Sequence, residues 1–114
     1  MNIHEIINVV GAKVLSGDHL ADNQVMKAFA SDLMSDVLTL DSENILLITG
    51  LNNLQTIRTA EIADIRAILF VRNKKPSSEM RALANKENII LMTTEKSLFY
   101  TSGLLFGAGL NPIY

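Results

Sequence analysis

The stretch ILLITGLNNLQTIRTAEIADIRAILFVRNKKPSSEMRALANKENIILMT, residues 45–93, decides the fold of this 114-residue chain. It contains three nearly continuous apolar runs, Ile45–Thr49, Ala67–Val71 and Ile89–Thr93, which begin at equal intervals. Short runs of this kind are typical of strands that are buried on both faces of a parallel sheet. Helical spacing between the runs predicts βαβ units with right-handed crossovers. We therefore predict a single α/β domain over residues 1–114, with a mainly parallel central sheet flanked by helices.

The segments between and after these runs predict helices. Residues 54–65 carry apolar side chains at roughly helical spacing, namely Leu54, Ile57, Ala60, Ile62 and Ile65. Ser77-Ser78 can cap a second helix that ends near Lys86. Thr94 can cap a last helix over Glu95–Phe106. The stretch Gly103–Leu110 is more apolar than a peripheral helix needs, so it either closes the core or covers a partner subunit.

The first thirty residues predict three further elements. Residues 3–10 show the apolar stripe of a short helix, formed by Ile3, Ile6, Ile7 and Val10. Gly11 follows this stripe as a C-cap. Lys13–Ser16 then predicts a short strand, and Val25–Ala30 predicts a second one after a polar loop.

Two carboxylates lie four residues apart in the next segment. A helix that begins after Ser31-Asp32 places Leu33, Val37 and Leu40 on one apolar face. Asp32 and Asp36 then share a face of that helix, and paired carboxylates can serve acid–base catalysis or bind Mg²⁺. We expect instead that Asp32 caps the helix and that Asp36 faces water.

Composition narrows the classes of partner. The chain has 10 basic and 12 acidic residues and a net charge of −2, which gives no general attraction to nucleic acid or an anionic membrane. It has no Cys, which excludes disulfides and thiolate sites and fits a reducing compartment. Met1–Glu5 shows no signal-peptide pattern, and the uncharged stretch Ser97–Tyr114 is too short and too rich in Gly and Pro for a membrane span. We expect a cytoplasmic protein.

No motif for catalysis or cofactor binding stands out. His4 and His19 have no Asp, Glu or His at a metal-ligand spacing and no nucleophile partner. The loop at Gly50 lacks both the P-loop lysine and the glycine spacing of dinucleotide sites. We therefore predict a protein that is not an enzyme, with no catalytic residue, no metal site and no cofactor.

Three loops follow the apolar runs, at 49–53, 72–77 and 93–96. In an open parallel sheet, ligands bind outside the carboxyl ends of the strands, and helix N-termini there favour anions. The sequence thus predicts a phosphate or carboxylate site, although polar loops of this kind can also be merely solvated. The candidate residues are Thr49, Gly50, Asn52, Asn53, Arg72, Asn73, Lys74, Thr93 and Thr94.

Several stretches, taken in order, resemble a stand-alone DRTGG-domain protein over nearly the whole chain. They are Ala30–Leu38, Leu47–Gly50, Gln55–Asp64, Val71–Pro76, Ser97–Phe99 and Gly103–Leu105. The resemblance implies a non-catalytic, accessory α/β module, often dimeric, with a ligand-sensing role and a fold similar to the N-terminal domain of HPr kinase/phosphorylase. Such domains occur in bacterial phosphotransacetylases and in pyrophosphatases with CBS domains.

The residues and the resemblance together suggest three functional hypotheses. The first is a homodimeric regulatory module that binds a small anionic ligand or nucleotide. The second is a protein-interaction subunit of a redox or hydrogenase-related complex, which the apolar stretch Gly103–Leu110 suggests. The resemblance adds that small members are found beside redox and hydrogenase-like genes in anaerobic bacteria. The third, a phosphotransfer enzyme by analogy with HPr kinase, is disfavoured because the chain has no P-loop. Where the family has its name-giving Gly-Asp-Arg and Thr-Gly-Gly, this chain has Gly50-Leu51-Asn52 and Arg72-Asn73-Lys74. This difference predicts a changed ligand specificity.

Overall fold

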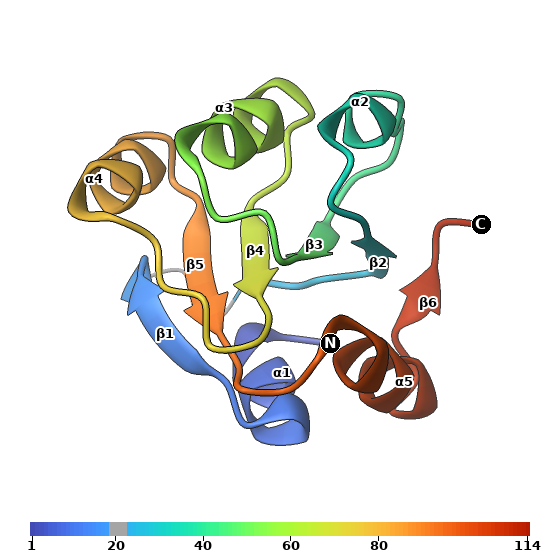
Figure 1. The fold of residues 1–114 in the computed structure, drawn as a ribbon. Coiled ribbons are helices and arrows are strands. Elements are labelled where there is room, and N and C mark those ends of the chain that lie inside the picture. The colour runs from blue at the N-terminus through green and yellow to red at the C-terminus, as the bar shows by residue number, and fades with distance from the viewer. Residues whose placement is uncertain (19–22) are drawn as a thin grey trace.

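In a computed structural model that describes residues 1–18 and 23–114, one six-stranded sheet lies between two layers of helices (Figure 1). The strands are β1 (Lys13–Ser16), β2 (Lys27–Ala30), β3 (Ile45–Thr49), β4 (Ala67–Phe70), β5 (Ile90–Thr93) and β6 (Asn111–Pro112). The helices are α1 (Ile3–Val10), α2 (Met34–Val37), α3 (Leu54–Ile62), α4 (Ser78–Lys86) and α5 (Leu98–Gly107). Helices α2, α3 and α4 cover one face, and α1 and α5 cover the other. His19 lies outside the described residues.

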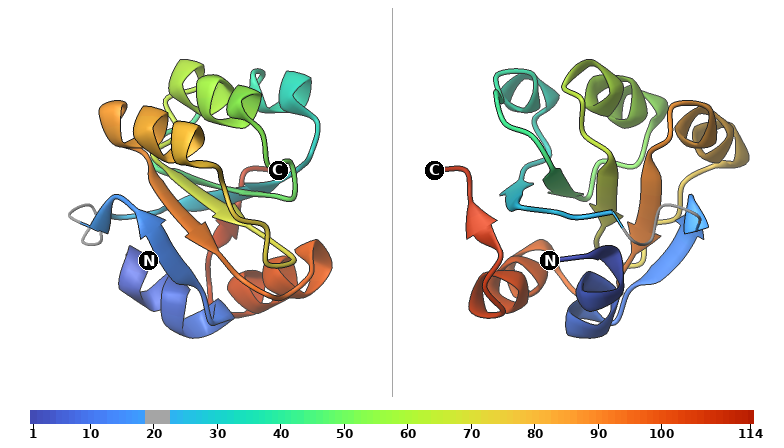
Figure 2. Two further views of the ribbon diagram at one scale, coloured as in Figure 1. Left: turned by 60° about the vertical axis from the view of Figure 1, so that its left-hand side comes forward. Right: turned by 180° about the vertical axis from the view of Figure 1, so that it is seen from behind.

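The sheet has the order β1-β5-β4-β3-β2-β6. Strand β1 is antiparallel to β5, and all other neighbours are parallel. The predicted α/β class with a mainly parallel sheet is therefore confirmed. Figure 2 shows β1 at one end of the sheet and β6 with α5 at the other. The short edge strand β6 was not predicted, because two residues that include a proline carry no strand pattern.

The central strands are apolar throughout because both of their faces are covered. In β3, Leu46 and Ile48 pack in the cluster under α1 and α5, whereas Ile45 and Leu47 pack in the cluster under α2, α3 and α4. Every residue of β3, β4 and β5 is buried. Burial on both faces explains why these strands appear in the sequence as continuous runs instead of alternating patterns.

Four helices end in the same kind of turn, which returns the chain to the sheet. A residue in the left-handed conformation follows each helix: Gly11, Asp64, Asn88 and Gly109. The next N–H then donates to the carbonyl five residues back, as from Ile65 to Ala60 at 2.8 Å. This is the hydrogen bond of the Schellman motif. Helices α3 and α4 have equal lengths and end in the same kind of turn, and β3, β4 and β5 begin at residues 45, 67 and 90.

The segment after β2 differs from the prediction. Helix α2 is a single turn, its N-cap is Leu33, and no side chain caps it. Leu33 is exposed, and Met34 and Val37 are the residues that α2 buries. The predicted apolar face is therefore wrong at Leu33, and Asp32 is not the cap. Asp36 is exposed, as expected.

Two helices are shorter than predicted. Helix α3 ends at Ile62, whose side chain is 74% exposed, so Ile62 does not belong to the inward stripe. Helix α5 is capped by Ser97, not by Thr94, and starts at Leu98. The predicted cap of α4 at Ser77 and the left-handed Gly11 after α1 are both observed. Among residues 1–18 and 23–114, no helix has the length and hydrophobicity that a membrane span requires.

Candidate functional site

The carboxyl ends of β3, β4 and β5 bring the three predicted loops together, because these strands are adjacent and parallel. Hydrogen bonds join the loops directly. The Asn73 N–H donates to the Thr94 carbonyl at 2.7 Å, and the Arg72 N–H donates to the Lys96 carbonyl at 2.8 Å. The Asn52 side-chain amide donates to the Lys75 carbonyl at 2.8 Å. We call this surface, formed by residues 49–53, 72–77 and 93–96, the carboxyl edge.

Asp32 occupies the β3 end of the carboxyl edge. Its Oδ1 accepts a hydrogen bond from the Thr49 hydroxyl at 2.9 Å and another from the Gly50 N–H at 2.7 Å. The two groups that were predicted to meet a ligand anion therefore already meet a carboxylate of the chain. Sequence reasoning missed this role because Asp32 lies on a different strand–loop unit and resembles a local helix cap.

Asn52 and Asn53 have different roles at the start of α3. The Asn53 side chain caps α3 by accepting from the Thr56 N–H at 3.2 Å. Asn52 is half-buried and uses only its amide nitrogen. Its Oδ1 is buried and has no hydrogen-bond partner in the described part of the chain. Because this oxygen has almost no solvent-exposed surface, a ligand does not reach it in this structure.

The β4 loop carries three of the four cations of the carboxyl edge, and Lys96 in the β5 loop is the fourth. Arg72 and Asn73 both adopt the left-handed conformation, with φ of 56° and 58°, which turns the chain sharply after β4. The side chains of Arg72, Lys74 and Lys75 are exposed. Within residues 1–18 and 23–114, none of these three cations forms an ion pair with a carboxylate. They are thus available to bind anionic groups.

Thr93 and Thr94 are buried and use their hydroxyl hydrogens within the chain. The Thr93 hydroxyl donates to the Lys74 carbonyl at 2.7 Å. The Thr94 hydroxyl donates to the Val10 carbonyl at 2.8 Å, and Lys96 Nζ donates to the same carbonyl at 3.0 Å. These contacts fix the β5 loop against the β4 loop and the end of α1. The two hydroxyls therefore position the carboxyl edge in this structure.

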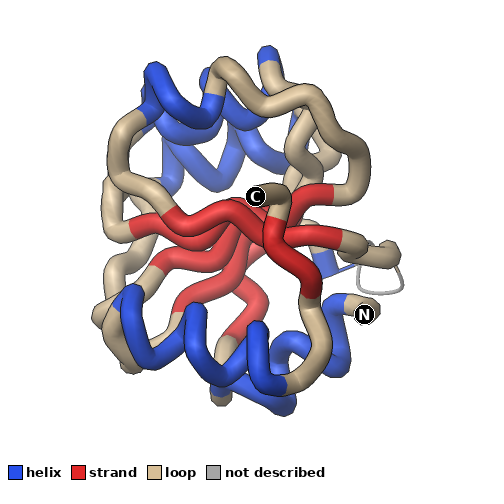
Figure 3. The backbone as a smooth tube through the Cα atoms, turned by 90° about the vertical axis from the view of Figure 1, so that its right-hand side faces the viewer, coloured by secondary structure: helices blue, strands red, loops and turns tan. Residues whose placement is uncertain are grey.

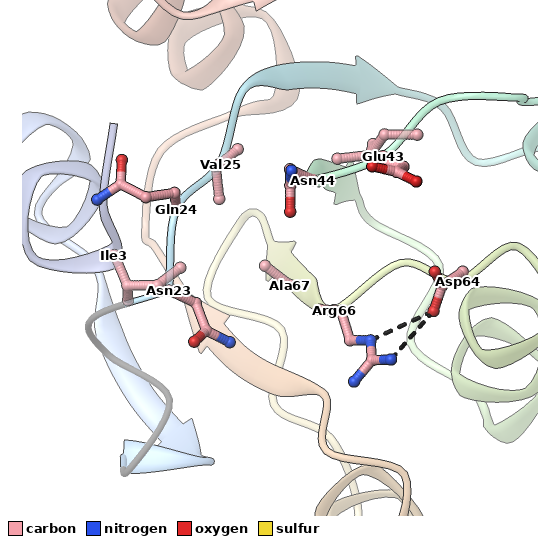
Figure 4. Close-up of a pocket in the computed structure, with 10 residues that line it drawn as sticks. Ile3, Asn23, Gln24, Val25, Glu43, Asn44, Asp64, Arg66 and Ala67 are labelled. Atoms are coloured by element: carbon pink, nitrogen blue, oxygen red, sulfur yellow. Dashed lines mark hydrogen bonds and ion pairs between the residues drawn. The ribbon is translucent and has the colours of Figure 1, made fainter.

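Several cavities lie away from the carboxyl edge, and none of them was predicted. A polar cavity of about 360 Å³ lies at the opposite ends of β3 and β4, where Arg66 pairs with Asp64 at 3.3 Å (Figure 4). An apolar groove of about 370 Å³ lies between α5 and the β2 side of the sheet. In the described part of the chain, no group of three or more His, Asp or Glu side chains could hold a metal ion.

The comparisons with known proteins agree with this fold. The family model described as "DRTGG domain" matches residues 5–107. A solved structure of the CBS and DRTGG domains from the regulatory region of Clostridium perfringens pyrophosphatase, complexed with the activator diadenosine tetraphosphate, is similar to this chain, with a TM-score of 0.73 and 17% sequence identity. The match covers 91% of this chain and 45% of that one, so the chain spans less than half of that protein. No curated protein sequence matches.

Proposed function

Because the chain belongs to the DRTGG domain family, we propose that it is a regulatory module that binds a small anionic ligand of the nucleotide class at the carboxyl edge. The observation that carries the proposal is the cluster of Arg72, Lys74 and Lys75, three exposed cations in one loop without a carboxylate partner among the described residues. The similar pyrophosphatase region binds a dinucleoside tetraphosphate, which is a polyanion. A module of this kind senses a metabolite instead of converting it.

The charges of the carboxyl edge suggest how such a ligand lies. Asp32 repels phosphate from the β3 end, so the phosphates lie at the β4 loop, beside Lys74 and Lys75. Asn52 lies next to that loop, because its side-chain amide donates a hydrogen bond to the Lys75 carbonyl. The phosphate groups of the ligand thus supply the affinity of the site.

Isothermal titration calorimetry tests the proposal with ATP, diadenosine tetraphosphate, inorganic phosphate and adenosine as separate probes. We expect a phosphorylated nucleoside to bind more tightly than phosphate or adenosine alone. Lys74→Gln removes a cation from the site and should weaken binding about tenfold or more, since hydrogen bonds to charged groups contribute about 1.5–3 kcal/mol. Lys86→Gln makes the same charge change at the far end of α4 and should leave binding unchanged. Absence of binding by every probe at millimolar concentration contradicts the proposal.

The exposed apolar side of α5 supports association with a protein as part of the same function. Phe99 is 90% exposed and Phe106 is 67% exposed. A regulatory homodimer and an interaction subunit of a larger redox or hydrogenase-related complex both use such a surface. Affinity capture with the full chain, compared with a Phe106→Ser variant, distinguishes them: the homodimer predicts recovery of the chain itself, and the subunit predicts recovery of other proteins.

A further inference from the structure

Helix α5 buries only one of its sides. Thr101 and Leu105 are buried against the sheet, and Leu98 and Leu104 are partly buried beside them. At 3.6 residues per turn, Gly103 lies on the side opposite to Thr101 and Leu105. Figure 3 shows α5 along the lower front of the molecule with no other described segment in front of it.

The outward side of α5 is also apolar. It carries Phe99, Tyr100, Gly103, Phe106 and Gly107, which we call the α5 face, and all five residues are exposed. No charged residue occurs from Ser97 to Tyr114. A helix that is apolar all round is characteristic of a buried position, whereas surface helices are polar on their outer side. The outward sides of α3 and α4 follow the surface pattern, with residues such as Arg58 and Glu79 exposed.

Neither the backbone conformation nor a close contact among the described residues explains why position 103, inside α5, is a glycine. Its φ is not in the left-handed region, and a Cβ added there would meet no atom within 4 Å. Glycine destabilises a helix interior relative to alanine, so its presence needs another cause. A glycine at the centre of an exposed apolar helix face lets the backbone of a second helix approach closely. Gly107, one turn further on, is equally open.

The α5 face also borders a hollow. The apolar groove of about 370 Å³ is lined on the sheet side by the small residues Ala28 and Ala30, and on the helix side by Phe99, Gly103 and Phe106. One surface therefore presents projecting aromatic rings beside an apolar depression. A surface with both features can complement a copy of itself across a two-fold axis.

The exposed area of the α5 face and its lack of charged side chains favour a second copy of the chain as its partner. The exposed parts of Phe99, Tyr100 and Phe106 amount to roughly 400 Å², since an aromatic side chain can bury 150–250 Å². This is about half of the roughly 800 Å² that each partner contributes to a standard interface, and the groove walls and glycine backbone add to it. No side chain of the α5 face is charged, and the cation beside it, Lys96 Nζ, lies 5.8 Å from the centre of the Tyr100 ring, so the face offers little complement to an acidic or basic partner. A second copy brings an equally uncharged, aromatic surface, which is the composition found at the centres of interfaces.

We propose that the α5 face binds the α5 face of a second copy of this chain. In this two-fold dimer, Gly103 of each copy allows the two helices to approach, and Phe99 of each copy enters the apolar groove of the other. The inference rests on the regulatory homodimer, one of the two assemblies considered for the α5 surface in the proposed function, and it gives that dimer an interface. It does not depend on ligand binding at the carboxyl edge.

Sedimentation equilibrium of the full chain tests the interface. We expect a species of twice the 12.5 kDa chain mass at micromolar concentration. Phe99→Asp and Gly103→Leu should each raise the dimer dissociation constant at least about thirtyfold, as loss of an interface hot spot does. Ile62→Asp changes a similarly exposed apolar residue on α3 and should leave the dimer intact. Circular dichroism should show that all variants remain folded.

Three results overturn the proposal. These are a wild-type chain that stays monomeric at all concentrations, a dimer that survives both Phe99→Asp and Gly103→Leu, and a monomer that uses the α5 face to bind another protein. Titration of Phe99→Asp with the nucleotide probes separates this inference from the ligand site. A monomeric variant that binds the ligand supports both proposals, and a dimer that binds none of the probes contradicts only the ligand site.

Discussion

Asp32 Oδ1 lies 2.9 Å from the Thr49 hydroxyl, so a carboxylate that follows β2 holds the carboxyl end of β3. The same oxygen accepts the Gly50 N–H at 2.7 Å. Thr49 itself is fully buried, and its oxygen accepts the Leu51 N–H at 3.1 Å. The Asp32–Thr49 contact therefore determines the shape of the first loop of the carboxyl edge.

Removing the Asp32 carboxylate should destabilise the fold. Asp32→Ala leaves the buried Thr49 hydroxyl and the Gly50 N–H without this acceptor, and an unsatisfied buried group costs about 1–3 kcal/mol. Urea unfolding measures the loss. Asp36→Ala, at an exposed position on α2, should change the free energy of unfolding by less than about 0.5 kcal/mol. Equal losses in the two variants would mean that the Asp32 contacts are unimportant for stability.

The Val10 carbonyl at the end of α1 receives two donors from the β5 loop, and these donors should compensate for each other. Thr94→Val removes the 2.8 Å hydroxyl bond, and Lys96→Met removes the 3.0 Å ammonium bond. Each single variant should lose about 1 kcal/mol, because the other donor remains. The double variant leaves the carbonyl unpaired and should lose more than the sum of the singles. Urea unfolding of all four proteins gives the coupling, and strict additivity would contradict it.

The left-handed Asn88 after α4 should favour glycine over alanine. Its φ is 57°, a conformation that costs roughly 1–2 kcal/mol for most residues and nothing for glycine. We expect Asn88→Ala to lower the free energy of unfolding by about 1 kcal/mol and Asn88→Gly to maintain or raise it. Asn85→Ala, inside the same helix and exposed, serves as the control. Thermal and urea unfolding should agree, and a stable Asn88→Ala variant would refute the argument.

The sequence predicted the parts of this molecule that depend on local pattern. The runs at Ile45, Ala67 and Ile89 identified the central strands, and Ser77 identified the start of α4. Both signals, a continuous apolar run and a capping residue before a helix, can be recognised from residues that are neighbours in the sequence. Ile62 was assigned inward as part of an approximate helical stripe, but at 3.6 residues per turn it lies about 140° from Ile57 and about 160° from Ala60, so it faces away from the core.

The parts that the sequence did not predict depend on distant contacts. Asp32 looks like a cap from its neighbours, and only the adjacency of β2 and β3 reveals that it binds Thr49. The placement of the three loops at one edge was correctly predicted from the expected parallel direction of the strands, because parallel strands end at the same edge of a sheet. Whether Thr49, Gly50, Thr93 and Thr94 contact a ligand stays a prediction, since their polar hydrogens already have partners within the chain.

The negative charge of Asp32 should weaken the binding of an anionic ligand at the carboxyl edge. Asp32→Asn keeps an oxygen that can accept from Thr49 and Gly50 but removes the negative charge from the carboxyl edge. An anionic ligand near Lys74 should then bind more tightly, by up to about 1 kcal/mol for exposed charges, or about fivefold in Kd. The gain should shrink as salt is added, because screening weakens the repulsion that the wild type exerts. Calorimetry with ATP at low and high salt measures both effects, with Asp36→Asn as the control for net charge. Tighter binding in both variants would indicate a general charge effect, and weaker binding in Asp32→Asn alone would show that the carboxylate assists the ligand instead of repelling it.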